Sequence, residues 1–333
     1  MEPRPAYTGL HPPMHGAFPT IKSRTYGFAM RCNVWVTVIY YDSPMSDAQR
    51  REKLFAGDLF VYSPRPATLA LVEFARQMTE EAFSPHFPPD AQHQLPGQAY
   101  VDVLAGLKPS FINHARSKEL VVAILAELGA NPGETYFDVP RLRSMTSEFL
   151  NAGLTLQFES HRDTWFSAPF CQINWWMPVY DVVESNVMAF HPRYFSGATR
   201  NTSRDYDYFE WVRTGRPAAA MNVDMESRRQ PELEEPIEMT PDIRLITPPG
   251  GIILFSGAQL HTTVPNTSGR TRFSIDFRTV HIEDVRSGNG AANVDSACSG
   301  TNLGDFLRST DHATLPQELV DAYINKVSAP STL

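Results

Sequence analysis

Arg272-Phe273-Ser274-Ile275-Asp276-Phe277-Arg278 alternates between polar and apolar side chains and continues as Thr279-Val280-His281. Successive side chains of a strand point to opposite faces of a sheet, so the pattern predicts a long β-strand over 272–281. One face would bury Phe273, Ile275 and Phe277. The opposite face would present Arg272, Ser274, Asp276 and Arg278.

Shorter strands are expected before this one, at 154–158, 170–180, 186–190, 242–246 and 252–255. Short strands joined by Pro and Gly turns are typical of a sandwich or a jelly roll. A polar stretch at 192–241 interrupts the series. A connection of that length inside a compact domain is typically a functional lid or a disordered loop.

The first half of the chain predicts helical segments with a few strands. Ser46 and Gln49 have the spacing of a capping box, and Gly57 suits the left-handed residue after the helix that they begin. A short strand is expected at 58–62 and further helices over 67–83 and up to Leu128. Near the other end of the chain, Pro316 suits the first turn of a C-terminal helix.

Composition excludes several functions. The chain carries 29 basic and 37 acidic residues, and its basic residues do not cluster, so no nucleic-acid partner is expected. No apolar run approaches the ~18–20 residues of a membrane span. The N-terminus lacks the apolar segment of a signal peptide. Three scattered cysteines form neither a disulfide framework nor a zinc cluster, and a reducing, cytoplasmic location is the default expectation.

Three residues just past predicted strands indicate a metal site. His161 and Asp163 lie two positions apart, so their side chains point the same way on an extended segment, and His261 follows 100 residues after His161. Two histidines and one carboxylate form one face of an octahedron in non-haem Fe(II) oxygenases. A second His-x-acid triplet, His281-Ile282-Glu283, is the weaker alternative, because the one histidine after it lies in the predicted helical tail.

Arg272 follows His261 by 11 residues, and Ser274 lies on the same face of the same strand. A guanidinium and a hydroxyl together suit a carboxylate. A molecule that chelates the metal at one end and carries a carboxylate at the other would fit both groups, and 2-oxoglutarate is such a molecule. Gln157 and Asn174 are further candidate cosubstrate ligands. Alternatively, Arg272 pairs with Asp276, and Arg270 or Arg278 binds the carboxylate.

These motifs resemble the phytanoyl-CoA dioxygenase-like branch of the Fe(II)/2-oxoglutarate oxygenases. The matching segments begin with His161-x-Asp163 and the strand at 172–179. The acidic turn at 181–186 is similar to the branch's D-D-x-x-x-E-N-G, and the segment from Gly250 to His261 is similar to its G-D-x-x-x-F…H. Arg272 follows at the family's spacing. The chain departs from the branch at Ala189-Phe190-His191-Pro192, where the branch usually has Pro-Gly-Ser-His.

The resemblance implies a mainly β fold with flanking helices, whose core is a double-stranded β-helix (a cupin-like jelly roll). We expect a single oxygenase domain over 1–333. Its parts would be a helical and β N-terminal support (1–150), the jelly-roll core (151–285) with its insertion (192–241), and a C-terminal helical tail (286–333).

The implied activity is that of an oxidoreductase that uses Fe(II), 2-oxoglutarate and O2. It would hydroxylate an unactivated C–H bond of a small metabolite and release succinate and CO2. His161, Asp163 and His261 would be the catalytic metal ligands, and Arg272 and Ser274 would bind 2-oxoglutarate.

The sequence leaves the exact reaction open. Desaturation and ring closure share the iron step, whereas Asp163 argues against halogenation, because the halogenases of this superfamily have Gly or Ala there. A cupin-type metalloenzyme that does not use 2-oxoglutarate is a second candidate, and a metal-free binding module is a third. The C-terminal helix offers a surface for oligomer formation. Expected substrate contacts are Arg162, Trp165, His191 and Arg193.

Overall fold

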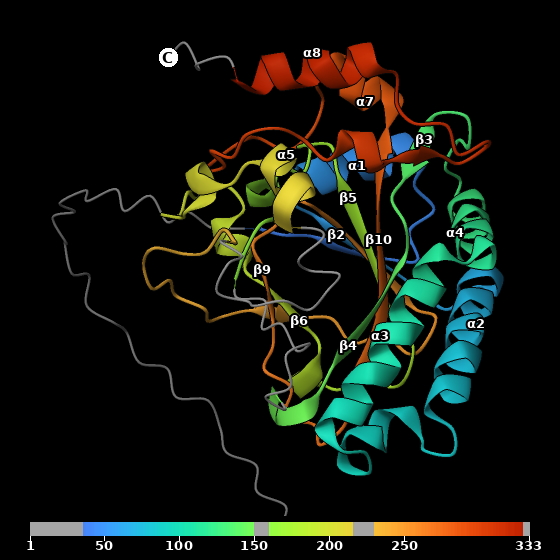
Figure 1. Ribbon diagram of the computed structural model, residues 1–333. Coiled ribbons are helices and arrows are strands. Elements are labelled where there is room, and N and C mark those ends of the chain that lie inside the picture. The colour runs from blue at the N-terminus through green and yellow to red at the C-terminus, as the bar shows by residue number, and fades with distance from the viewer. Residues whose placement is uncertain (1–35, 150–159, 216–229, 329–333) are drawn as a thin grey trace, which may run out of the picture. The chain divides into compact units, whose positions relative to one another are not determined.

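The computed structural model describes residues 36–149, 160–215 and 230–328. The strand expected at 154–158, together with Gln157, lies outside these ranges. Two β-sheets form the centre of the described part (Figure 1).

The larger sheet has eight strands. Its order is β1 (Ile39–Tyr41), β2 (Leu59–Tyr62), β8 (Ile252–Ser256), β5 (Ile173–Pro178), β10 (Arg272–His281), β3 (Thr135–Phe137) and β11 (Leu307–Arg308), and β4 (Arg141–Met145) pairs with β10 beside β3. The smaller sheet has the order β7 (Ile243–Arg244), β6 (Met188–Phe190) and β9 (His261–Thr263).

From β4 onward the chain passes back and forth between the two sheets. Strands β4, β5, β8 and β10 are neighbours in the larger sheet, in the order β4-β10-β5-β8, and β6, β7 and β9 form the smaller one. Such double-sheet winding is the jelly-roll topology. The predicted double-stranded β-helix core is therefore confirmed.

Strand β10 has the predicted bounds and the predicted alternation. Phe273, Ile275 and Phe277 are at most 1% exposed and belong to the main hydrophobic core. Ser274 and Asp276 point the other way, into a pocket between the sheets. One face of the central strand thus builds the core, and the opposite face builds the pocket.

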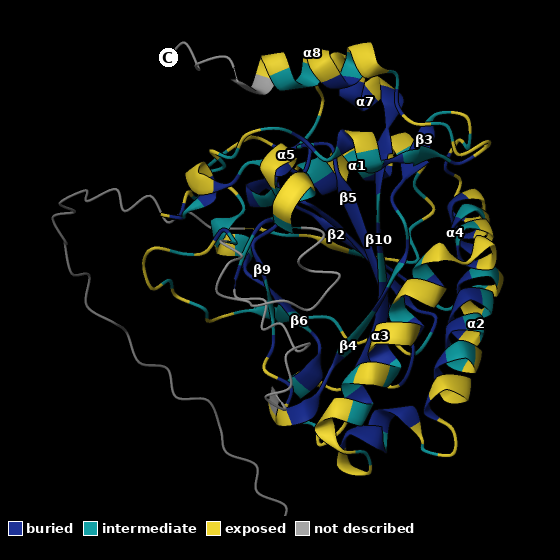
Figure 2. Cartoon of the chain, in the orientation of Figure 1, coloured by how far each residue is buried: buried dark blue, intermediate teal, exposed yellow. Residues whose placement is uncertain are grey.

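Helices cover the core face of the larger sheet. The described α-helices are α1 (Asp47–Phe55), α2 (Pro66–Phe83), α3 (Gly97–Asn113), α4 (Ala115–Glu127), α5 (Tyr208–Glu210), α7 (Ile282–Ser287) and α8 (Gln317–Ser328). Apolar side chains of α2, α3 and α4 share the main core with β10, and α3 packs beside β4. Their outer faces are exposed, whereas the strands are largely buried (Figure 2).

The predicted capping residues of the first helix are confirmed. Ser46 and Gln49 form the capping box of α1, and Gly57 has φ +98°. The first half of the chain also contributes β1 to β4 to the larger sheet, so it extends the sheet as well as supporting it. In the described ranges, no helix has the length and apolar character needed to cross a membrane.

Candidate active site

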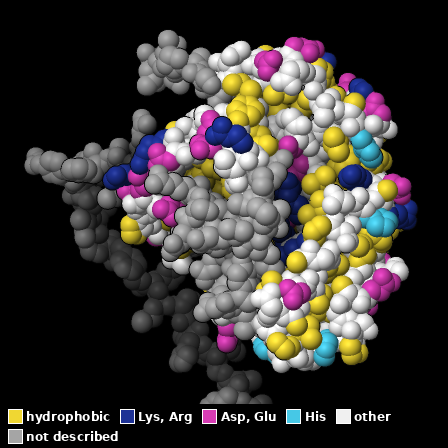
Figure 3. All heavy atoms as spheres, viewed as in Figure 1, with side chains coloured by type: hydrophobic (Ala, Val, Ile, Leu, Met, Phe, Trp, Pro, Cys, Tyr) yellow, Lys and Arg dark blue, Asp and Glu magenta, His cyan; other side chains and the backbone are white. Residues whose placement is uncertain are grey.

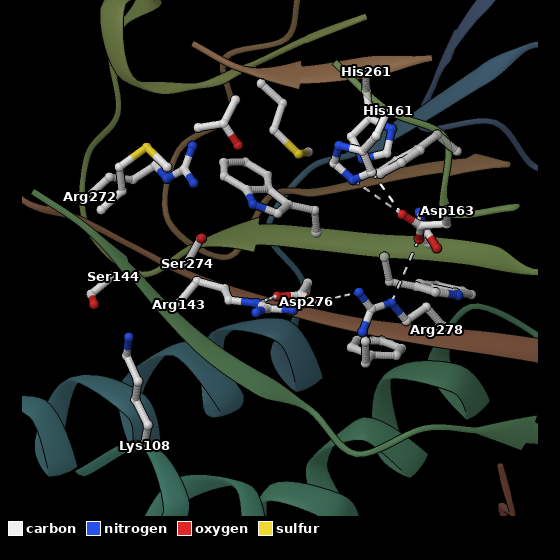
Figure 4. Close-up of a pocket in the computed structure, with 18 residues that line it drawn as sticks. Lys108, Arg143, Ser144, His161, Asp163, His261, Arg272, Ser274, Asp276 and Arg278 are labelled. Carbon is white, nitrogen blue, oxygen red and sulfur yellow. Dashed lines mark hydrogen bonds and ion pairs between the residues drawn. The ribbon is translucent and has the colours of Figure 1, made fainter. Parts of the chain in front are cut away.

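The two histidines of the predicted metal site are held together by the backbone. The N–H of His161 donates to the carbonyl of His261 at 3.0 Å, and the N–H of His261 donates back to His161, also at 3.0 Å. Asp163 begins a short 3₁₀ helix, Asp163–Phe166, directly after this bridge. One ligand atom from each of the three residues lies within 4.8 Å of the others (Figure 4).

Hydrogen bonds orient the ligand atoms of this cluster. Nδ1 of His261 lies 3.0 Å from the Gln259 carbonyl, so it carries the proton, and Nε2 faces Oδ1 of Asp163 at 3.9 Å. Nε2 of His161 lies 3.6 Å from the same oxygen. The other oxygen of Asp163, Oδ2, accepts hydrogen bonds from Gln172 at 2.9 Å and Asn174 at 2.8 Å.

The protonation states suit a metal ligand set. Burial, together with nearby His161, lowers the pKa of His261 to about 4, so its imidazole is neutral near pH 7. Burial raises the pKa of Asp163, but the hydrogen bond with His161 and the charge of Arg278 outweigh burial and hold that pKa well below its usual range. Metal ligands must be deprotonated. The donor set, its tautomer and its supporting amides all fit a divalent transition metal.

Arg272 and Ser274 lie in the same pocket with polar atoms that lack partners. Nη1 of Arg272 donates to the Asn186 carbonyl at 3.0 Å, and the guanidinium lies 5.7 Å from the Trp176 ring. Nε of Arg272 and Oγ of Ser274 are buried and have no hydrogen-bond partner among the described residues. Because unpaired buried donors are costly, this pair fits a bound carboxylate.

The alternatives for the carboxylate-binding arginine pair with acidic residues of the protein. Asp276 accepts from Arg143 at 2.6 and 3.3 Å, rather than from Arg272. Arg278 lies 3.2 Å from Asp138 and 3.4 Å from Asp276. Arg270 is largely exposed and pairs with Asp90 at 3.0 Å. Arg272 therefore remains the arginine best placed for a cosubstrate carboxylate.

The rival triplet forms a helix cap. Nδ1 of His281 accepts from the backbone N–H of Glu283 at 3.3 Å, which caps α7. Its Nε2 lies 3.4 Å from Glu134. The residues of this triplet do not line the pocket.

Asn174 lines the pocket, but its amide holds the metal-site carboxylate. Gln172 has the same role, and sequence reasoning missed it. Gln172 directly precedes β5 and Asn174 lies on it. Side chains two positions apart on an extended segment share a face, so the spacing of Gln172 from Asn174 was the signal that could have identified Gln172.

The four expected substrate contacts do not line the pocket. Arg162 is buried, lies 3.0 Å from Asp295 and donates to the carbonyls of Ala258, Tyr194 and Gly197. Trp165 also donates to Asp295, at 2.8 Å. His191 lies 2.8 Å from Thr262, and Arg193 pairs with Glu238. A substrate role for these residues stays a prediction.

The pocket receives further residues from the first half of the chain. These are Lys108 of α3 and Arg143, Ser144 and Met145 of β4. Arg143 lies directly opposite Ser274 in the β4–β10 register, which turns both side chains to the same face. Sequence reasoning missed these residues, because no local pattern pairs 141–145 with 272–276.

No protein-family model matches the chain, and no curated protein sequence matches it. Solved structures with some likeness include EvdO2 from Micromonospora carbonacea var. aurantiaca complexed with 2-oxoglutarate, at 14% identity and TM-score 0.43, covering 71% of this chain and 91% of that one. The non-heme alpha-ketoglutarate-dependent epimerase SnoN from nogalamycin biosynthesis has 14% identity and TM-score 0.36, covering 71% and 84%. The non-heme monooxygenase ThoJ has 14% identity and TM-score 0.37, covering 80% and 88%. These likenesses are weak, and the resemblance to the phytanoyl-CoA dioxygenase-like branch stays a prediction.

Proposed function

We propose that this chain is an Fe(II)- and 2-oxoglutarate-dependent oxygenase. The observation that carries the proposal is that one pocket contains two sets of groups. One set suits a metal ion, and the other suits the far carboxylate of a cosubstrate bound to that metal. His161, Asp163 and His261 form a two-histidine, one-carboxylate face. Arg272 and Ser274 offer buried donors without partners in the described part of the chain.

The three ligands would hold Fe(II), and Arg272 with Ser274 would bind the far carboxylate of 2-oxoglutarate. When bound, this combination supplies with O2 the oxidising power to attack a C–H bond, with release of succinate and CO2. Three protein ligands of this kind would hold the metal and still allow such a cosubstrate to bind it.

The protein's own residues orient and shield this chemistry. The amides of Gln172 and Asn174 hold Oδ2 of Asp163, which leaves Oδ1 directed at the two imidazoles. The Gln259 carbonyl holds the proton of His261 on Nδ1, so Nε2 keeps its lone pair for a metal. Trp176 and Phe255 give the pocket apolar walls, which would favour a bound organic molecule over water beside the metal ligands.

Hydroxylation of a small metabolite is the reaction that we propose. Desaturation and ring closure use the same site and are not separated from hydroxylation by its geometry. A cupin-type enzyme without 2-oxoglutarate would need the metal ligands but gives no role to the buried, unpaired donors of Arg272 and Ser274. A single domain, a cytoplasmic location and an oligomer formed through α8 remain further predictions.

Calorimetric titration tests the proposal. Mn(II), which does not support turnover, is titrated into the metal-free protein, and 2-oxoglutarate is then titrated into the loaded protein. We expect one metal per chain, and binding of 2-oxoglutarate only after the metal. Metal binding without any affinity for 2-oxoglutarate would favour the cupin-type alternative, and no metal binding would overturn the enzyme proposal.

A further inference from the structure

A buried ion pair lies beside the turn that carries Asp163, outside the pocket. Nε of Arg162 lies 3.0 Å from Oδ1 of Asp295, and the two side chains are 1% and 4% exposed. Many other charged side chains lie on the surface of the molecule (Figure 3), where ion pairs contribute little to stability. A buried pair that loses one partner leaves an uncompensated charge, which is strongly destabilising. The contact between Arg162 and Asp295 is therefore one on which the local structure depends.

Both carboxylate oxygens of Asp295 accept hydrogen bonds. Oδ1 accepts from Nε1 of Trp165 at 2.8 Å. Oδ2 accepts from the backbone N–H of Thr199 at 3.0 Å and from its hydroxyl at 3.1 Å. An amide has only one accepting oxygen, so an asparagine at this position would leave a donor unpaired on one side or the other.

Three segments that are distant in the sequence meet at Asp295. The residue belongs to the segment between α7 and α8, which passes beside α5 (Figure 1). The guanidinium of Arg162 also donates to the carbonyls of Tyr194 and Gly197, at the start of the expected insertion. The expected C-terminal tail and the start of the insertion thus both hold the turn that follows His161.

Asp163 depends on this anchor more than the two histidines do. The backbone bridge fixes His161 and His261 to each other, but Asp163 begins its 3₁₀ helix just after that bridge. Arg162 precedes Asp163, and Trp165 follows it in the same turn; neither lines the pocket, whereas Asp163 does. Because its neighbours are bound outside the pocket, the carboxylate of Asp163 is directed into it.

We propose that Asp295 is a positioning residue of the metal site, which places the carboxylate of Asp163 by binding Arg162 and Trp165. This inference rests on the metal site of the proposed function and extends it to the C-terminal segment. Asp295 does not line the pocket, so it would act on the metal only through the turn. Metal affinity and metal geometry would therefore depend on a residue that is not a ligand.

Asp295→Asn in the full-length protein tests the proposal. The matched control is Asp284→Asn, because Asp284 of α7 forms another largely buried ion pair, with Arg51 at 2.6 Å, and does not line the pocket. Each metal-free protein is titrated with Co(II), whose visible spectrum reports the number and arrangement of its ligands. Urea denaturation of the metal-free proteins measures their stability.

Both substitutions should lower the urea midpoint, because each breaks a buried ion pair. Asp295→Asn should in addition weaken Co(II) binding by about tenfold or more, as removal of a ligand's supporting partner typically does. It should also change the spectrum of the Co(II)-saturated protein. Asp284→Asn should keep the affinity and the spectrum of the wild-type protein. Wild-type affinity and spectrum in Asp295→Asn would overturn the proposal, as would an equal loss of affinity in both variants.

A milder variant keeps the test decisive if Asp295→Asn does not fold. Trp165→Phe removes one donor to Asp295 and keeps an aromatic ring. It should change the Co(II) spectrum in saturated protein, and an unchanged spectrum would overturn the proposal.

Failure of the proposed function is distinguishable from failure of this inference. A wild-type protein that binds no Co(II) would overturn both. Metal binding without affinity for 2-oxoglutarate in the calorimetric titration would overturn the proposed function alone. A wild-type protein that binds both, with no effect of Asp295→Asn on the metal, would overturn this inference alone.

Discussion

His161 and His261, 100 residues apart in the sequence, are partners in an antiparallel bridge in which each backbone N–H donates to the other's carbonyl at 3.0 Å. The two histidines of the proposed metal site are thus positioned by the backbone hydrogen bonds of this bridge. Their ring centroids lie 4.4 Å apart. The two imidazoles therefore lie side by side without a metal, because the backbone bridge fixes their positions.

The first prediction concerns the metal. His161→Ala and His261→Ala should each lower the affinity for Fe(II) by more than about 100-fold, because losing even a supporting partner of a ligand typically costs 10–100-fold. Anaerobic equilibrium dialysis with iron analysis measures this. His281→Ala is the matched control, since His281 caps α7. It should cost about 1 kcal/mol of stability and leave iron binding unchanged; an equal loss of iron there would place the metal elsewhere.

The second prediction separates metal positioning from cosubstrate binding. Gln172→Ala and Asn174→Ala each remove an amide from Oδ2 of Asp163. We expect each variant to bind Fe(II) about 10–100-fold more weakly, with little change in the dissociation constant of 2-oxoglutarate once iron is saturating. A large change in that constant for Asn174→Ala, with normal iron affinity, would instead support a direct contact with the cosubstrate.

The third prediction concerns the carboxylate site. Arg272→Ala should raise the dissociation constant of 2-oxoglutarate about 10–100-fold, since a hydrogen bond to a charged group contributes about 1.5–3 kcal/mol. Iron binding should not change. Arg270→Ala is the control, because Arg270 is exposed and pairs with Asp90. If the Arg270 variant loses 2-oxoglutarate binding and the Arg272 variant keeps it, the assignment is wrong.

The fourth prediction is that Lys108 lowers the stability of the ligand-free fold. The pKa of Lys108 falls to about 8 in the fold, from an ordinary value of 10.5. Between these two pH values, the Lys108 amine is therefore protonated more often in the unfolded chain than in the folded one. Stability therefore rises with pH through this window. Lys108→Met should raise the free energy of unfolding at pH 7 by about 1–2 kcal/mol, and this gain should shrink as the pH approaches 10. Urea denaturation at pH 7 and pH 10 measures both values; a destabilised Met variant at pH 7 would contradict the prediction.

Much of the fold could be predicted because local patterns and tertiary burial agree. The bounds of β10 follow from an alternation that the core reproduces, with Ile275 buried and Ser274 facing the pocket. The capping box of α1 depends on four neighbouring residues, so sequence spacing suffices to identify it. His161, Asp163 and His261 could be found because each follows a predicted strand.

What could not be predicted depends on pairing between distant segments. Arg143 enters the pocket because β4 pairs with β10, and Lys108 enters because α3 packs beside β4. Neither relationship leaves a periodic signal in the sequence. Arg162 illustrates the same point for a charge. Its buried contacts depend on Asp295, 133 residues away, and on backbone carbonyls, so they could not be predicted from its place in the chain, and its expected substrate role stays a prediction.

The visible spectrum of the Fe(II) protein tests the central claim most directly. When 2-oxoglutarate is added without oxygen, chelation of iron through its keto oxygen and adjacent carboxylate should give a weak charge-transfer band. The band should be absent in His261→Ala and should need more 2-oxoglutarate in Arg272→Ala. A wild-type protein that binds one iron per chain but shows no band at saturating 2-oxoglutarate would contradict the account.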